Sequence, residues 1–228
     1  GSSAPGSTSN KFHRYNSWVS QLNVVKDTSQ LIVVSANGSN YATVSMHTKG
    51  SDGYWADNYS VTGRVGKNGI GKTSEGDKKT PTGVYTFGQV FGVADNPGSS
   101  RGYLKVKNNH YWVDDSSSIY YNKLVDISQT GKRWNSAERL AKYPKAYKYA
   151  IAVNYNTECI PGKGSAIFLH CDTGNATAGC ISLPESTMIY KKTSKHLNVC
   201  LKPAWIFRQG NIIERNFQIR LEQNSNRL

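Results

Sequence analysis

The 228-residue sequence has no long apolar run and few acidic residues. A helix that crosses a membrane needs about 18 consecutive apolar residues, and no such stretch exists here. Acidic residues number 15 against 28 basic ones, which gives a formal net charge of +13. The basic residues are scattered rather than grouped in blocks, and no signature of a nucleic-acid-binding module accompanies them. The charge favours a polyanionic partner, such as an acidic membrane face or an anionic cell wall, and we expect no nucleic-acid partner.

Cysteine is also scarce. The four cysteines are Cys159, Cys171, Cys180 and Cys200. None has the C-x-x-C spacing of a structural zinc site, so we expect no metal. If Cys180 is a free nucleophile, the other three form at most one disulfide, and the sequence does not choose among the three pairs. We favour the state in which all the thiols are free.

The residues that are abundant favour short strands and turns. The sequence has 14 Tyr, 6 Phe and 21 Gly, a composition typical of strands separated by tight turns. At least ten short strands are expected, and residues 37–40, NGSN, form a hairpin signal between two of them. The expected strands include 31–34, 41–47, 84–87, 103–107, 111–113, 149–153, 166–169 and 204–207. This pattern predicts a mainly β, sandwich-like domain with a few short helices.

Two helices are predicted. Residues 134–143 have the clearest helical pattern, with a serine suited to cap the start and Pro144 to end the helix. A second helix is predicted from about residue 184 to residue 196, where the spacing of a capping box occurs. If its N-terminus points at Cys180, the helix dipole favours a thiolate there.

The length is that of one domain with peripheral ends. Residues 1–29 are interpreted as a linker and an ordered lead-in, 30–213 as the domain, and 214–228 as a C-terminal tail. The first ten residues lack the charged-then-apolar pattern of a secretory signal and are typical of a linker.

Residues 66–73, GKNGIGKT, satisfy the phosphate-binding pattern G-x-x-x-x-G-K-[ST]. That loop binds phosphate only when a buried strand leads into it and a helix begins directly after it. Here the preceding residues are polar, and the following SEGDKKTPTG contains glycine and proline that would break a helix. We therefore expect no nucleotide to bind at Gly66 to Thr73.

The strongest candidate for chemistry is the stretch 167–186, IFLHCDTGNATAGCISLPES. The apolar residues before His170 predict a strand that presents this imidazole, and a hairpin-like return would bring Cys180 beside it. An imidazole in that position helps a thiol to form its thiolate. Gly179 allows a close approach of the backbone, and the amides of Gly179 and Cys180 would face an oxyanion. The competing interpretation is a buried histidine and a small apolar thiol without a catalytic role.

The segment IFLH…TAGCISLP and the upstream segment GRVGKNGIGKTSEGDKKTPTGVYTF together resemble the L,D-transpeptidase (YkuD-type) catalytic domain family. The resemblance covers about residues 30–210 and is to the branch in which Thr-Ala-Gly-Cys replaces Ser-His-Gly-Cys. It implies the same mainly β fold and an enzyme of the bacterial cell envelope that acts on peptidoglycan. The cysteine chemistry of the family needs no cofactor and no metal.

The resemblance also assigns roles to residues. Cys180 matches the nucleophile, His170 the base, and the backbone carbonyl of Cys171 the group that orients the imidazole. Thr177 and Ser182 match polar positions that contact substrate, although Ser182 is equally well placed to cap a helix. The implied reaction is attack by Cys180 on the L-Lys or meso-diaminopimelate carbonyl of a stem tetrapeptide, release of D-Ala, and formation of a 3-3 cross-link.

One departure from the family pattern leaves the acceptor of the acyl group open. Ala178 stands where the commoner motif has a second histidine. With water as the acceptor, the same residues would make the protein an L,D-carboxypeptidase. A non-catalytic wall-binding module would keep the charge and the aromatic residues and would need no reactive thiol. The resemblance further implies that carbapenems acylate Cys180 and that residues 80–83, TPTG, shape the wall of the site.

Overall fold

The computed structural model describes residues 15–189 and 197–203, and over this part the chain is mainly β, as predicted. The helices have three or four residues each: η1 Trp18–Gln21, η2 Asn23–Lys26, α1 Ile127–Thr130, η3 Leu140–Lys142, η4 Ala146–Lys148 and α2 Glu185–Met188. The strands are β1 Gln30–Ala36, β2 Tyr41–Lys49, β3 Trp55–Arg64, β4 Gly83–Gly92, β5 Tyr103–Lys105, β6 His110–Val113, β7 Leu124–Asp126, β8 Ala137–Arg139, β9 Ala150–Val153, β10 Phe168–Cys171, β11 Ile181–Leu183 and β12 Leu197–Pro203.

The chain begins its main sheet with an antiparallel meander of β1, β2 and β3. The predicted turn at 37–40 lies between β1 and β2, where Gly38 has a φ of +91° that a residue with a side chain rarely adopts. Along β2 the alternation is clear, because Ala42, Val44 and Met46 are buried while Tyr41 and Thr43 are exposed. Strand alternation therefore directs one face of the meander to the core.

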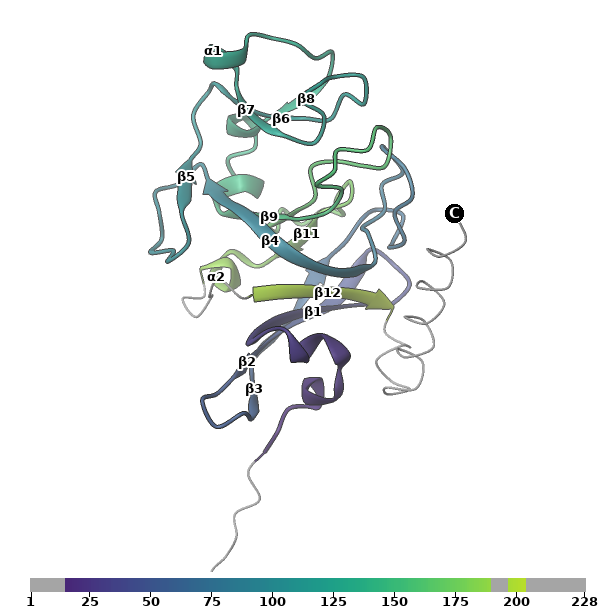
Figure 1. Ribbon diagram of the computed structural model, residues 1–228, viewed down its shortest axis with the longest axis vertical. Coiled ribbons are helices and arrows are strands. Elements are labelled where there is room, and N and C mark those ends of the chain that lie inside the picture. Colours follow the sequence, from purple (N-terminus) through teal and green to yellow (C-terminus); the bar gives the residue numbers. More distant parts are fainter. Residues whose placement is uncertain (1–14, 190–196, 204–228) are drawn as a thin grey trace, which may run out of the picture.

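The large sheet has the strand order β12-β1-β2-β3-β11-β10-β9-β4-β5. Strand β12 runs parallel to β1 and also pairs antiparallel with β4, so the sheet curls round and closes on itself (Figure 1). The two halves of the curled sheet face each other across a common core. The architecture is the sandwich-like one that the sequence predicts, with β10 and β11 in its middle.

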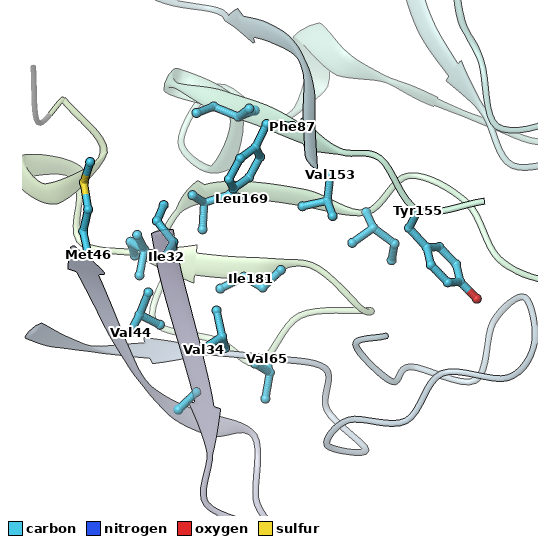
Figure 2. Close-up of a cluster of buried hydrophobic side chains, with 14 of the residues drawn as sticks. Ile32, Val34, Val44, Met46, Val65, Phe87, Val153, Tyr155, Leu169 and Ile181 are labelled. Carbon is cyan, nitrogen blue, oxygen red and sulfur yellow. The ribbon is translucent and has the colours of Figure 1, made fainter. Parts of the chain in front are cut away.

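Aliphatic side chains from both halves of the sheet fill this core (Figure 2). Leu169 of β10 and Ile181 of β11 are buried in it beside Ile32, Val44 and other residues of the meander. Each fully buried aliphatic side chain contributes about 1.5–3 kcal/mol of transfer free energy. Leu169 and Ile181 directly adjoin His170 and Cys180 in sequence, so packing in the core holds the two strands that carry the candidate site.

A second, three-stranded sheet with the order β7-β6-β8 lies at the top of Figure 1, formed by the chain between β5 and β9. The helix predicted over 134–143 is wrong, because this stretch forms β8 followed by the 3-10 helix η3. Ala137 and Glu138 pair with Val113 and Trp112 of β6 instead. The local helical propensity is overridden by this pairing and by the burial of the adjacent Leu140.

Parts of other predictions lie outside the described residues. These are the first half of the N-terminal lead-in, the second half of the helix predicted over 184–196, the strand 204–207 and the tail 214–228. No helix within 15–189 and 197–203 is long and apolar enough to cross a membrane.

Candidate active site

His170 lies in β10, and Cys180 directly precedes the neighbouring strand β11 at the centre of the large sheet. The strands β10 and β11 are parallel, with Leu169 opposite Ile181 and His170 opposite Ser182. The predicted hairpin-like return is therefore wrong: the loop 172–180 runs back along β10 before β11 begins, because parallel strands need a crossover and not a tight turn. This return places Cys180 level with Phe168, two residues before the histidine.

The register also places the two side chains on one face of the sheet. Leu169 and Ile181 point into the main core, whereas Phe168 and Cys180 belong to a second apolar cluster on the opposite face. His170 follows the alternation to this second face, where its ring packs edge-on against Tyr147 with 5.5 Å between the ring centroids. Both His170 and Cys180 are only 7% exposed. The predicted pair thus shares one buried face of the sheet, and among the described hydrogen bonds none joins the two side chains.

One hydrogen bond decides the tautomer of His170. Its Nδ1 lies 2.8 Å from the carbonyl oxygen of Cys171, the group to which the family resemblance gives the orienting role. A carbonyl oxygen only accepts, so Nδ1 donates and the neutral ring has its free lone pair on Nε2. Burial lowers the pKa of His170, and the bond to Cys171 opposes this shift only in part. The imidazole is therefore neutral at pH 7, which is the form of a general base.

The thiol of Cys180 is held by the backbone of β10 and of the residues before it. Its Sγ accepts a hydrogen bond from the amide of Phe168 at 3.3 Å and donates to the carbonyl oxygen of Ala166 at 3.3 Å. Burial raises the pKa of Cys180 well above its ordinary value, and the nearby carboxylate of Glu138 raises it further. The expected thiolate is therefore not present in the free protein, where the sulfur is a protonated donor.

The residue before Cys180 has a backbone geometry that favours glycine. Gly179 has a φ of +149°, and a Cβ there would lie 3.0 Å from the carbonyl oxygen of Lys79. The Gly179 amide donates to Thr177 Oγ1 at 3.2 Å, so of the two amides expected to face an oxyanion this one is occupied inside the loop. Among the described backbone hydrogen bonds outside helices and strands, none comes from the Cys180 amide, so this amide is the remaining candidate donor.

Two threonines hold the carbonyl of Cys180. Thr177 Oγ1 donates to this oxygen at 2.6 Å and Thr80 Oγ1 at 3.3 Å. Thr80 belongs to the upstream TPTG segment, and its hydroxyl also accepts from the amide of Gly66 at 2.8 Å. Thr177 is anchored to the same upstream segment by a bond from its amide to the carbonyl oxygen of Val65 at 3.1 Å. The two sequence blocks that pointed to a family thus meet at the nucleophile.

Residues 24–196 match the family described as the L,D-transpeptidase catalytic domain, YkuD. The chain belongs to this family. Enzymes of this family depend on a cysteine and act on the peptidoglycan of the cell wall. The family predicted from the two sequence blocks is confirmed.

The other comparisons carry no information about function. No curated protein is significantly similar to this chain in sequence. Among solved structures, the helical cell shape determining protein Pgp2 from Campylobacter jejuni matches with a TM-score of 0.41 and 16% identity. The match covers 82% of this chain and 54% of the Pgp2 chain. The present chain therefore spans about half the length of that relative, and so distant a likeness says nothing about activity.

The residues expected to contact substrate in this L,D-transpeptidase domain are engaged with the protein itself. Ser182 is 1% exposed, and its hydroxyl donates to Asp172 at 3.2 Å. It does not cap a helix, because it lies within β11 and Pro184 occupies the cap position of α2. Three residues of extended chain separate Cys180 from Pro184, so the dipole of α2 does not act on the thiol as the sequence suggested.

The described cysteines form no disulfide with one another. Cys159, Cys171 and Cys180 are all free thiols, and the side chain of Cys200 lies outside the described residues. Cys171 is buried, with its Sγ 3.6 Å from the carbonyl oxygen of Tyr149. Within 15–189 and 197–203 no cluster of three or more His, Cys, Asp or Glu side chains is arranged to hold a metal ion.

Two site residues of the L,D-transpeptidase domain escaped the sequence analysis. Tyr147 packs its ring against His170 and donates its hydroxyl to a carboxylate oxygen of Glu138. Burial raises the pKa of Glu138 to about 7, although the bond from Tyr147 opposes the shift. The sequence offered no signal for this pair, because Glu138 lies in the stretch 134–143 that was predicted to be a helix.

A second buried polar cluster lies on the meander, outside the L,D-transpeptidase motifs. His47 Nδ1 is 2.6 Å from Asp57 Oδ1, and its Nε2 is 2.8 Å from the hydroxyl of Ser45. Ser17, which precedes η1, also donates to Asp57, and the ring of Trp18 in η1 packs edge-on against His47. Ser45 lies in the middle of β2. This cluster joins the N-terminal segment to the sheet.

Proposed function

We propose that this protein is an extracytoplasmic bacterial L,D-transpeptidase that acylates itself on stem tetrapeptides of peptidoglycan. The observation that carries the proposal is the Nδ1–H bond from His170 to the carbonyl of Cys171, on the face of the sheet that also carries Cys180. This bond leaves Nε2 as the basic atom of a neutral imidazole. A neutral base beside a protonated thiol is the starting state for nucleophilic catalysis by cysteine.

The proposed acylation begins when His170 Nε2 takes the proton of the Cys180 thiol as the sulfur attacks. The electrophile is the carbonyl carbon of the L-Lys or meso-diaminopimelate residue, whose oxygen becomes an oxyanion. The C–N bond to D-Ala then breaks, and the leaving amine takes the proton from Nε2. A thioester on Cys180 remains, and D-Ala is released.

Deacylation repeats these steps with a second nucleophile. A side-chain amine of a neighbouring stem attacks the thioester, loses a proton to Nε2, and expels the sulfur, which regains that proton. The product is a 3-3 cross-link. Water attacking the same thioester would give a tripeptide, the reaction of an L,D-carboxypeptidase. Ala178 is exposed and has no polar group to orient either nucleophile, so the acceptor depends on other residues.

The deciding experiment is digestion of purified disaccharide-tetrapeptides, followed by product identification by mass spectrometry. A dimer that has lost one D-Ala supports transpeptidation, and a tripeptide monomer supports the carboxypeptidase. Neither product, together with binding to isolated cell walls, would support the non-catalytic module. The Cys180→Ala variant is the control, and product formation by this variant would overturn the proposal.

The charge and the phosphate-loop-like segment bear on the proposed partners. A net charge of +13 suits an anionic cell wall. The lysine that would bind phosphate, Lys72, has its Nζ 2.8 Å from Asp77 Oδ1, and no helix follows the segment before β4 begins. We expect no nucleotide partner and no nucleic-acid partner. Magnesium-dependent ATP binding that is lost in Lys72→Ala would contradict this expectation.

A further inference from the structure

Lys72 has an unusual position for a lysine in a polar loop. Its side chain is only 2% exposed. It passes beside Gly164, where a Cβ would lie 2.3 Å from Lys72 Cε. Its Nζ is adjacent to Gly179, since a Cβ on that residue would be 3.8 Å away. The ammonium group therefore lies next to the residue that immediately precedes the nucleophile.

Asp77 fixes the ammonium group in this place. Its Oδ1 accepts from Lys72 Nζ at 2.8 Å and from the amide of Lys79 at 3.0 Å, and its Oδ2 accepts from the amides of Thr73 and Ser74 at 2.8 and 3.1 Å. Burial raises the pKa of Asp77, but these bonds outweigh it and hold the pKa well below its usual range. Asp77 is thus a permanent anion with its orientation set by the loop backbone.

A buried ion pair contributes little to stability in most proteins, because desolvation of the two charges offsets their attraction. The loop could fill the space beside Gly164 and Gly179 with an apolar side chain at similar or lower free energy. A cation is needed there only if negative charge develops nearby. The sulfur of Cys180 and the oxyanion of an acyl-transfer intermediate are the two places where the proposed reaction develops it.

One of the two backbone amides expected to face an oxyanion is already occupied. The amide of Gly179 donates to Thr177 Oγ1 and not outward, which leaves the amide of Cys180 as the backbone donor. Oxyanion stabilisation in acyl transfer relies on preorganised hydrogen-bond donors and positive groups aimed at the developing charge. Of the side chains that act electrostatically on the Cys180 thiol, Glu138 disfavours its ionisation when it is itself ionised, and Lys72 is the cation that favours it.

We propose that Lys72 is a catalytic residue whose ammonium group stabilises the negative charge formed on Cys180 and on the tetrahedral oxyanion, with Asp77 as its positioning residue. The proposal rests on the proposed function, because it needs the acylation step. It gives the lysine of the phosphate-loop-like segment a role in acyl transfer in place of phosphate binding.

The test uses Lys72→Met, which keeps the apolar stem and removes the charge, Lys72→Arg, which keeps a charge, and Lys67→Met as the matched control. Lys67 is an exposed lysine of the same loop. We measure the second-order rate of acylation by a carbapenem and the pH profile of Cys180 alkylation, with the other cysteines changed to Ser. We expect Lys72→Met to slow acylation by about 10²-fold, the size of losing one oxyanion donor, and to move the alkylation profile to higher pH. Lys72→Arg should retain part of the rate, and Lys67→Met should match the parent.

A rate and a profile for Lys72→Met that match the parent would overturn the proposal. If that variant does not fold, Asp77→Asn, which keeps the lysine but loosens its position, must show a smaller loss of rate in the same direction, and an unchanged rate is the contrary result. Failure of the proposed function is distinguishable, because the parent itself would then not be acylated. The alkylation profile would still report whether Lys72 acts on the thiol, and an unchanged profile would overturn its role.

Discussion

The hydroxyl of Thr80 donates a hydrogen bond to the carbonyl oxygen of Cys180 across 100 residues of sequence. Thr80 is fully buried and its oxygen also accepts from the amide of Gly66. The upstream TPTG segment therefore holds the loop 172–180 directly, through a hydrogen bond to the backbone of Cys180.

Thr80→Val should test this support. Valine has nearly the same shape, so the variant leaves the Gly66 amide without its acceptor and the Cys180 carbonyl with one donor fewer. The loss should destabilise the protein by about 1–3 kcal/mol, the cost of an unsatisfied buried group, and should slow acylation of Cys180. Chemical denaturation and carbapenem acylation rates measure the two effects. Thr80→Ser, which keeps the hydroxyl, is the control, and equal behaviour of Val and Ser variants would contradict the role.

The reactivity of the cysteines should depend on the reagent. Cys180 is 7% exposed and its pKa is raised by burial, whereas Cys159 is partly exposed. A small neutral alkylating agent at pH 7 should therefore label Cys159 before Cys180. A carbapenem should instead give a single adduct on Cys180, because the strained amide needs the base. Peptide mapping distinguishes these patterns, and a carbapenem adduct on Cys159 alone would count against Cys180 as the nucleophile.

The pH dependence of acylation should report the ionisation of His170. Burial lowers the pKa of this imidazole, so the base stays neutral from pH 8 down to below about 6.5, the value of a free imidazole. Acylation should then fall only at lower pH, as Nε2 takes up a proton. His170→Gln should slow acylation by roughly 10²–10⁴-fold, the range for losing a positioned base, and should remove this inflection. An inflection that persists in a folded His170→Gln variant would assign the base elsewhere.

Acid should destabilise the fold through the cluster on the meander. Burial lowers the pKa of His47 more than the adjacent Asp57 raises it. Unfolded chains bind a proton at this histidine near pH 6.5, whereas the folded protein does so only at lower pH, so stability is lost as pH falls through this window. Burial raises the pKa of Asp57, but bonds from Ser17, Tyr15 and His47 outweigh it, which adds a second loss below about pH 4.

Denaturation by urea at pH 8, 6.5 and 5 checks the first loss. His47→Gln should reduce the decline between pH 6.5 and pH 5, since glutamine does not titrate. His170 shifts in the same direction, so His170→Gln should remove a further part of the decline. Stability that increases as the pH falls from 7 to 5 would contradict this account.

The sequence by itself was sufficient to predict the family and the mainly β class, and it named His170 and Cys180 as candidates. These features depend on local patterns. An apolar run ending at a histidine predicts a strand in any β fold, and the turn residues at 37–40 need a backbone conformation that few other residues adopt. The absence of a helix after residue 73 was equally local, because glycine and proline prevent one.

Tertiary structure alone decided the features that depend on distant partners. Residues 137–139 form a strand because β6 offers its unpaired edge, although their own pattern favours a helix. The strands β10 and β11 run parallel, although the short spacing between them favours a hairpin. Neither outcome can be read from spacing, since pairing energy comes from residues far away in the chain.

The protonation states of the site residues also depend on the tertiary structure. The sequence names a thiol and an imidazole, but their pKa values follow from what surrounds them after folding. Enclosure between β10, Tyr147 and the residues near Glu138 raises the pKa of Cys180 and lowers that of His170. Lys72 comes beside Gly179 only because the loop between β3 and β4 folds over the nucleophile. Burial and charge are properties of the assembled chain, which is why the residues could be named from the sequence and their protonation could not.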